Sequence, residues 1–217
     1  MIKVVAYMSK FLFFGDSITD AWRGRSPLPG ETVAYGCGFV NRLAGELLSE
    51  SVDNQVFNRG IAGDRIVDLY ARIRQDFWNL EPDCVTILVG ANDVWHEINS
   101  QNGVDIKRFE NIYRLIISET KEKFPSIRII LMEPFVHNGA STIEHYGEFL
   151  EIYNYAKIVK KLAKEFDLEL VELQEKFNEL IAVNGSAYYL ADGIHPTIVG
   201  AKVIADEWLK VYKRNKK

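Results

Sequence analysis

The sequence has few cysteines, few prolines and no long apolar run. Only Cys37 and Cys84 occur among 217 residues, without CxxC spacing, so we expect two reduced thiols and no disulfide framework. Six prolines and 15 glycines are too few for a disordered or fibrous chain. No stretch approaches the ~18 apolar residues of a membrane span. We therefore expect one globular domain over residues 1–217, stabilised by its own hydrophobic core.

The sequence also lacks an excess of positive charge and a signal peptide. Lysine and arginine number 26 against 30 aspartate and glutamate residues, so we expect no nucleic-acid partner and no membrane binding. The chain starts with apolar residues but has no small-residue cleavage site, which predicts a cytoplasmic protein. Met8 is an alternative start, which would make residues 1–7 an N-terminal extension. The sequence does not indicate an interface between copies of the chain, so it neither predicts nor excludes a homo-oligomer.

Short apolar runs alternate with helical patterns along the chain. The runs lie at residues 11–15, 55–58, 84–90, 127–133 and 168–172. Their continuous apolar character is typical of a parallel sheet that is covered on both faces. Helical spacing recurs at residues 66–77, 106–117 and 149–166, and again after Pro196. This alternation predicts a three-layer α/β/α sandwich with a central parallel sheet of about five strands.

Polar motifs follow the predicted strands. In an open α/β sheet, ligands bind beyond the carboxyl ends of the strands, so residues that follow strands are candidates for a site. These residues are GDSITD with Ser17, NRGIAGD with Gly63, GAND with Asn92, and, after a further helix, DGIHP with Asp192 and His195. We expect all four groups at one edge of the sheet. The longest irregular stretches, about 18–35 and 134–147, are expected to form loops around that site.

The residue types at this edge are those that acyl transfer requires. A serine hydroxyl needs an imidazole to take its proton, and the imidazole needs a carboxylate on its other nitrogen. Ser17, His195 and Asp192 provide this set. The backbone N–H groups of Ser17 and Gly63 and the Asn92 amide are candidate oxyanion donors, each worth about 3 kcal/mol of transition-state stabilisation.

At these residues the chain resembles the SGNH hydrolases, also called the GDSL lipase/esterase family. The first block reads GDSI, with Ile18 in place of the usual leucine; Gly63 matches the second block, Gly90 to Asp93 match GxND, and Asp192 to His195 match DxxH. The resemblance implies a flavodoxin-like fold, no cofactor, and hydrolysis of esters or thioesters through an acyl-enzyme. It also implies that Ser17, Asp192 and His195, which match the family's catalytic positions, are the catalytic residues of this protein.

Within that family, the stretches FxGDSITD, GANDVW and LMEPF look most like intracellular carbohydrate acetylesterases of the acetylxylan esterase type. The substrate implied is a small acetylated sugar. Aromatic residues near the motifs fit sugar faces and a small acyl pocket. The candidate substrate-binding aromatics are Trp22, Trp95, Tyr188 and Tyr189.

Other interpretations of these residues stay open on sequence alone. A lysophospholipase or acyl thioesterase would use the same three residues. A lipase would also need a broad aliphatic groove, and we identify no residues in the sequence that indicate one. A non-catalytic carbohydrate- or nucleotide-binding module would use the motifs as turns and caps, and the aromatics could be packing residues. No metal site is expected, because the remaining histidines have no HxH or HExxH spacing; they are His96, His137 and His145.

Overall fold

The computed structural model describes residues 9–25 and 31–214, so residues 1–7, the expected extension, lie outside the described residues. The strands are β1 (Lys10–Gly15), β2 (Gln55–Gly60), β3 (Cys84–Leu88), β4 (Arg128–Met132) and β5 (Glu169–Val171). The longer helices are α2 (Phe39–Glu50), α5 (Ala91–Ser100), α6 (Ile106–Lys123), α8 (Ile152–Glu165), α9 (Gln174–Asn184) and α11 (Ile198–Arg214). The short helices are α1 (Ser17–Asp20), α3 (Ile66–Ala71), α4 (Ile73–Asp76), α7 (Tyr146–Phe149) and α10 (Ser186–Tyr189), and 3₁₀ turns lie at Thr32–Tyr35, Trp78–Leu80 and Ile143–His145.

The sheet has the strand order β2-β1-β3-β4-β5, and every neighbouring pair is parallel. All five predicted apolar runs form strands, and this order is that of the flavodoxin-like fold. The chain steps from β1 to β2 on one side and then returns to place β3 on the other side of β1. The switch in direction therefore lies between β1 and β3, where open α/β sheets bind their ligands.

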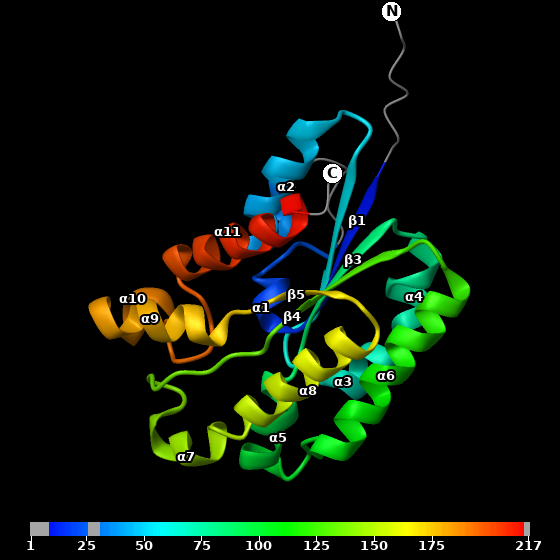
Figure 1. Cartoon of the computed structure of the whole chain (residues 1–217). Coiled ribbons are helices and arrows are strands. Elements are labelled where there is room, and N and C mark those ends of the chain that lie inside the picture. The colour runs from blue at the N-terminus through cyan, green and yellow to red at the C-terminus, as the bar shows by residue number, and fades with distance from the viewer. Residues whose placement is uncertain (1–8, 26–30, 215–217) are drawn as a thin grey trace, which may run out of the picture.

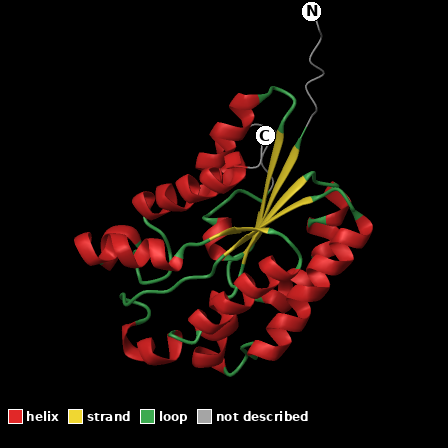
Figure 2. Ribbon diagram, viewed as in Figure 1, coloured by secondary structure: helices red, strands yellow, loops and turns green. Residues whose placement is uncertain are grey.

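Helices cover both faces of the sheet, which confirms the three-layer prediction. Figures 1 and 2 show α2 and α11 on one face and α3, α4, α6 and α8 on the other. The central strands are largely apolar: all five residues of β3 are buried, as are Phe11 to Phe14 of β1, whereas the edge strand β2 also carries polar residues. Trp208 of α11 lies against Phe13 with its ring centroid 5.7 Å away. The indole N–H of Trp208 donates to Thr86 Oγ1 at 2.9 Å, so its one polar atom is satisfied inside the core.

Some helices differ from their prediction. The helix expected over residues 66–77 is interrupted at Arg72, whose guanidinium binds the carboxylates of Asp64 and Asp76 and the carbonyl of Gly15. The helix expected from Phe149 is divided into α7 and α8. Three longer helices, α2, α5 and α9, were not predicted.

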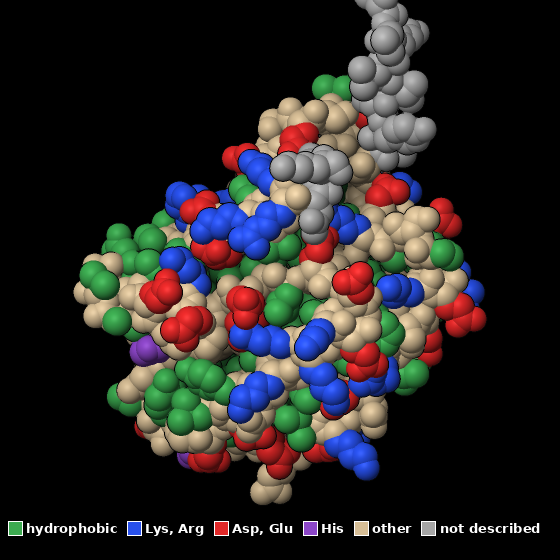
Figure 3. Space-filling view, in the orientation of Figure 1, with side chains coloured by type: hydrophobic (Ala, Val, Ile, Leu, Met, Phe, Trp, Pro, Cys, Tyr) green, Lys and Arg blue, Asp and Glu red, His purple; other side chains and the backbone are tan. Residues whose placement is uncertain are grey.

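The surface carries mixed charge. Figure 3 shows basic and acidic side chains interspersed over one face of the molecule, with no extended basic area on that face. Among the described helices, none has both the length and the apolar character to cross a membrane. Both thiols are free, with Cys84 buried in β3 and Cys37 exposed. The extent of the domain over residues 1–217 stays a prediction.

Candidate active site

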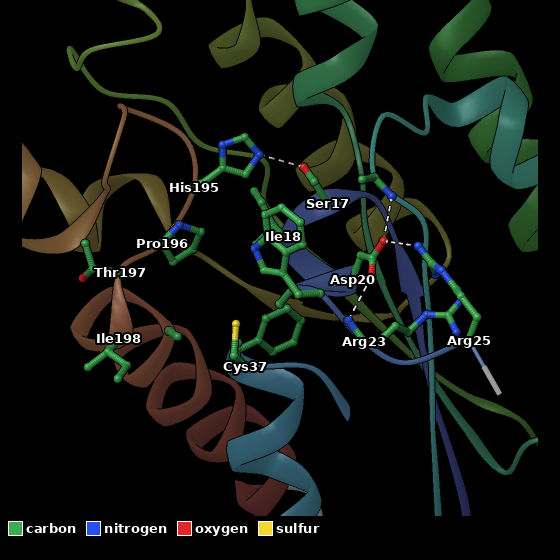
Figure 4. A pocket seen from close by; sticks show the side chains of 16 residues that line it. Ser17, Ile18, Asp20, Arg23, Arg25, Cys37, His195, Pro196, Thr197 and Ile198 are labelled. Carbon is green, nitrogen blue, oxygen red and sulfur yellow. Dashed lines mark hydrogen bonds and ion pairs between the residues drawn. The ribbon is translucent and has the colours of Figure 1, made fainter. Parts of the chain in front are cut away.

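Ser17 lies where β1 ends, at the first residue of the short helix α1. The carboxyl of Asp16 caps this helix by accepting the N–H of Ile18 at 3.0 Å. The Ser17 side chain points out of the sheet edge toward His195, and its Oγ lies 2.9 Å from His195 Nε2 (Figure 4). A residue near the start of the chain thus meets one near its end.

The loop between α10 and α11 holds His195 and its carboxylate partner. Leu190 and Pro196 form an antiparallel bridge that closes this loop, and Ala191 N–H donates to the carbonyl of His195 at 2.8 Å. Asp192 Oδ2 lies 2.8 Å from His195 Nδ1. Because Nδ1 is bound to the carboxylate, Nε2 is the nitrogen that faces Ser17 Oγ and is placed to accept its proton.

The Asp192 carboxylate is fixed by further donors. Its Oδ1 accepts the N–H groups of Ile194 and His195 at 3.0 and 2.8 Å, and Ser141 Oγ donates to Oδ2 at 3.2 Å. Partial burial alone would raise the pKa of Asp192, but hydrogen bonds from His195 and Ile194 hold this pKa well below its usual range. The carboxylate therefore stays charged at neutral pH.

The same interaction changes the basicity of the imidazole. The hydrogen bond to Asp192 raises the pKa of His195 above its usual value, against the lowering effect of partial burial. Burial in turn raises the pKa of Asp16, next to Ser17, to about 7. Asp16 is thus a second carboxyl whose charge influences His195 near neutral pH.

Two backbone N–H groups in the motif blocks have no acceptor among the described residues. Gly63 has φ +88°, a conformation that side chains rarely adopt, and a Cβ there would meet only His96 Nε2, at 3.9 Å. Within the part of the chain that the structure describes, the N–H groups of Ser17 and Gly63 donate to no other group. Both remain able to bind a negatively charged oxygen.

The side chain of Asn92 contacts the loop after β2. Its amide Nδ2 donates to the carbonyl of Asp64 at 3.1 Å, which joins the start of α5 to the loop after β2. Trp95 follows Asn92 by three residues, so the two share one face of α5. The ring of Trp95 lies 5.8 Å from that of His195, measured between centroids. The loops after β1, β2 and β3 and the His195 loop therefore converge, as the strand pattern predicts.

A pocket of about 820 Å³ opens beside Ser17 and His195 (Figure 4). Its lining is mainly apolar, with one acid and two arginines. The lining side chains include Ile18, Asp20, Ala21, Trp22, Arg23, Arg25, Cys37, Phe39, Pro196, Thr197, Ile198 and Ala201. Trp22 is 90% exposed, so its ring is free to contact a ligand at the mouth of the pocket.

A model of the GDSL-like lipase/acylhydrolase family matches residues 13–203 of this chain. The chain belongs to that family. The match runs from β1 into α11 and includes the four motif blocks. The resemblance seen in the sequence is therefore confirmed.

Relatives of this GDSL-like acylhydrolase include an acetylxylan esterase. The chain is 33% identical to an acetylxylan esterase of Geobacillus stearothermophilus over 214 residues, covering 93% of this chain and 92% of the relative. A crystal structure of an acetylxylan esterase from that organism has a TM-score of 0.82 at 33% identity, with 93% of each chain covered. A GDSL-like lipase from Parabacteroides merdae has a TM-score of 0.88 at 31% identity, covering 94% of this chain and 95% of the other. These findings place the protein among the serine carboxylic ester hydrolases and confirm its fold class.

The four aromatics predicted for substrate binding are not brought together in this GDSL-like acylhydrolase. Trp22 lines the pocket and Trp95 packs on His195. Tyr188 and Tyr189 are absent from the pocket lining described above. Tyr189 is only 5% exposed, and its hydroxyl oxygen accepts a hydrogen bond from the side-chain amide of Asn184. The structure therefore places Tyr189 in the core rather than on a substrate surface.

Sequence reasoning missed several residues of this site. Asp20 is buried and joins α1 to the loop after β2, because its carboxylate accepts the N–H of Ala62 at 3.0 Å. Arg23, Arg25 and Ser141 lie in the stretches 18–35 and 134–147, which were predicted to form the site. The loops were thus predictable, but nothing in the sequence distinguishes these side chains from solvent-exposed ones. Across the described ranges, no three His, Cys, Asp or Glu side chains are grouped so that they could hold a metal ion.

Proposed function

We propose that this protein is an acetylesterase that removes O-acetyl groups from carbohydrates, with Ser17 as the nucleophile. The observation that carries the proposal is the continuous chain of hydrogen bonds from Ser17 Oγ through His195 to Asp192. This arrangement allows the imidazole to take the serine proton while the carboxylate stabilises the resulting cation.

The first half of the reaction forms an acyl-enzyme. Ser17 Oγ attacks the carbonyl carbon of the ester, and its proton passes to His195 Nε2. The carbonyl oxygen becomes an oxyanion, which the N–H groups of Ser17 and Gly63 and the Asn92 amide stabilise by hydrogen bonds. The tetrahedral intermediate collapses when His195 gives its proton to the leaving alcohol oxygen.

The second half releases acetate. A water molecule attacks the acetyl carbon, His195 takes a proton from this water, and a second oxyanion forms at the same donors. Collapse of this intermediate breaks the bond to Ser17 Oγ, which regains its proton from His195. The enzyme returns to its starting state without a cofactor.

The comparisons support both the residues and the substrate class. Solved structures of the Geobacillus acetylxylan esterase include catalytic mutants in which a serine, an aspartate or a histidine is replaced by alanine. The replaced aspartate and histidine are three positions apart, as Asp192 and His195 are. The exposed ring of Trp22 at the pocket mouth offers the flat apolar surface on which sugar rings stack.

A second candidate function is hydrolysis of esters with longer acyl chains. The pocket is much larger than an acetyl group and has Ile18, Phe39 and Ile198 among its lining residues. These side chains provide an apolar wall that the sequence did not reveal. We favour the acetyl substrate because a relative that is 33% identical to this chain is an acetylxylan esterase.

Comparing p-nitrophenyl acetate with p-nitrophenyl octanoate decides between the two substrates. We expect a higher kcat/KM for the acetate, and release of acetate from acetylated xylo-oligosaccharides. A higher kcat/KM for the octanoate would replace the acetyl substrate with a long-chain one. Absence of turnover on every ester would instead favour the non-catalytic module. A cytoplasmic location and homo-oligomerisation stay predictions.

A further inference from the structure

The pocket beside Ser17 contains more positive than negative charge. Arg23, Arg25 and Asp20 are the charged side chains that line it apart from His195. The two arginines converge on one backbone carbonyl, because Arg23 Nε and Arg25 Nη1 donate to Gly60 O at 2.9 and 3.1 Å. Two cations thus share one end of the pocket with one carboxylate.

Both oxygens of the Asp20 carboxylate have partners. Its Oδ2 pairs with Arg25 Nη2 and accepts the N–H of Ala62, and its Oδ1 accepts the N–H of Arg23. Asp20 therefore balances the charge of Arg25. Within residues 9–25 and 31–214, no carboxylate lies within ion-pair distance of the Arg23 guanidinium.

The Arg23 guanidinium is fixed in place with unused donors. Its Nε bond to Gly60 orients the planar group, while its Nη1 and Nη2 have no acceptor in the described part of the chain. Partial burial and the neighbouring Arg25 lower the pKa of Arg23 to about 10, so the side chain is still charged at neutral pH. Nη1 and Nη2 are not among the buried polar atoms without a partner, so they are accessible from the pocket and can bind an anionic group of a ligand.

We propose that Arg23 binds an anionic group on the acetylated sugar, either the carboxylate of a uronic acid or a phosphate. This inference rests on the proposed function, because the same sugar carries the ester that Ser17 attacks. In the view of Figure 4, Asp20 stands between Ser17 and the two arginines, so the ester and the anionic group would occupy different ends of the pocket. The planar fork of a guanidinium matches the paired oxygens of both carboxylate and phosphate.

Three sugars that differ only at C6 test this site. They are the same mono-O-acetylated methyl glycoside in which C6 is the hydroxymethyl group of glucose, the carboxylate of glucuronic acid, or a hydroxymethyl group that carries a phosphate. We expect kcat/KM for one anionic sugar to exceed that for the neutral sugar about tenfold, as a charge-assisted hydrogen bond allows. The preferred anionic sugar shows whether carboxylate or phosphate is the natural group.

The variant Arg23→Gln should reduce this preference about tenfold. Arg74→Gln is the matched control, because Arg74 is an exposed arginine of α4 outside the pocket and its loss changes the net charge equally. We expect the control to keep the wild-type preference. Inhibition of p-nitrophenyl acetate hydrolysis by the three non-acetylated glycosides gives the same comparison independently of the acetyl position.

The outcomes separate this inference from the proposed function. Equal kcat/KM and equal inhibition constants for the three sugars in the wild-type enzyme would overturn the anionic site and leave the esterase intact. An anionic preference that persists in Arg23→Gln would also overturn the role of Arg23. Full esterase activity in Ser17→Ala would instead overturn the proposed function itself.

Discussion

A serine hydroxyl is a weak nucleophile, and the reactivity of Ser17 depends on the side chains around it. His195 Nε2 lies 2.9 Å from the hydroxyl, and Asp192 lies 2.8 Å from the other ring nitrogen. Ser141 and two backbone N–H groups fix Asp192 in turn. The hydrogen bond from His195 to Asp192, together with the bonds that fix Asp192, therefore holds the imidazole in the orientation and tautomer that proton transfer requires.

The activity should rise with pH as His195 loses its proton. Only the neutral imidazole accepts the proton of Ser17, and Asp192 raises the pKa of His195. We therefore expect kcat/KM to increase through an inflection above the ordinary value of about 6.5. A pH profile of kcat/KM for p-nitrophenyl acetate measures this inflection.

Replacing the carboxylate should move the inflection in the opposite direction. Asp192→Asn removes the negative charge that stabilises the protonated imidazole, so the inflection should move to lower pH, and kcat should fall by about 10⁴. Ionisation of Asp16, whose pKa is about 7, also favours protonated His195 and broadens the profile. If the inflection does not move in Asp192→Asn, the group that titrates there is Asp16 and not His195.

The Asn92 amide should act on the transition state more than on substrate binding. Asn92→Ala is expected to lower kcat by about 10²–10³ with little change in KM, because it removes an oxyanion donor. Asn99→Ala, an exposed asparagine later in α5, is the matched control and should have wild-type kinetics. A rise in KM at unchanged kcat would show that Asn92 binds the substrate and not the oxyanion.

At the scale of single residues, the motif residues were predictable from the sequence and the residues that contact them were not. Ser17, Asn92 and His195 follow strands or precede a helix in recognisable strings, so their place at the sheet edge could be inferred. Asp20 ends the GDSITD block, but nothing in that block indicates a role for its carboxylate, and Arg23 lies in no motif. Their importance comes from contacts with Gly60 and Ala62, which are about 40 residues away and become neighbours only through the pairing of β1 with β2.

Among the elements, strands were easier to predict than helices. Most strands are compact apolar runs, because both faces of the sheet are covered, although the edge strand β2 also carries polar residues. The helix α5 was missed because its residues, ANDVWHEINS, are mostly polar and its first turn buries Asn92 and Asp93 in the site. The Ile66 N–H donates to the Asp93 carboxyl at 3.0 Å, so the polar residues of α5 have partners that no periodicity can reveal.

The end of β2 should tolerate no side chain at Gly60. A Cβ on Gly60 would lie 2.1 Å from the backbone nitrogen of Asp20, so β2 and α1 would have to move apart. We expect Gly60→Ala to lower the free energy of unfolding by about 1–3 kcal/mol or more. Urea denaturation measures the change, and esterase activity should fall with it because the loop that carries Gly63 is displaced.

A glycine within a helix provides the opposite case. Gly45 lies in the middle of α2 and is exposed, and a Cβ on this residue would meet no other atom within 4 Å. Gly45→Ala should therefore raise the free energy of unfolding by about 0.5–1 kcal/mol, through the higher helix propensity of alanine. If Gly60→Ala and Gly45→Ala lowered the free energy of unfolding equally, crowding by a Cβ would not explain why residue 60 is a glycine.

At the scale of the whole molecule, the order of strands builds the site. β1 lies between β2 and β3, so the residues that follow these three strands meet at one edge of the sheet. The α/β/α architecture and this convergence were predictable from the alternation of strands and helices. The pocket was not, because its walls combine α1, the start of α2 and the start of α11, which only the tertiary packing brings together.

The most direct test of the account is to locate the site of covalent labelling by a fluorophosphonate with mass spectrometry. This reagent reacts with a serine that a neighbouring base activates. We expect one adduct, on Ser17, that forms quickly in the wild-type protein and is lost in His195→Ala. An adduct on a different serine, or no adduct in a protein that still hydrolyses p-nitrophenyl acetate, would contradict the assignment of Ser17 as the nucleophile.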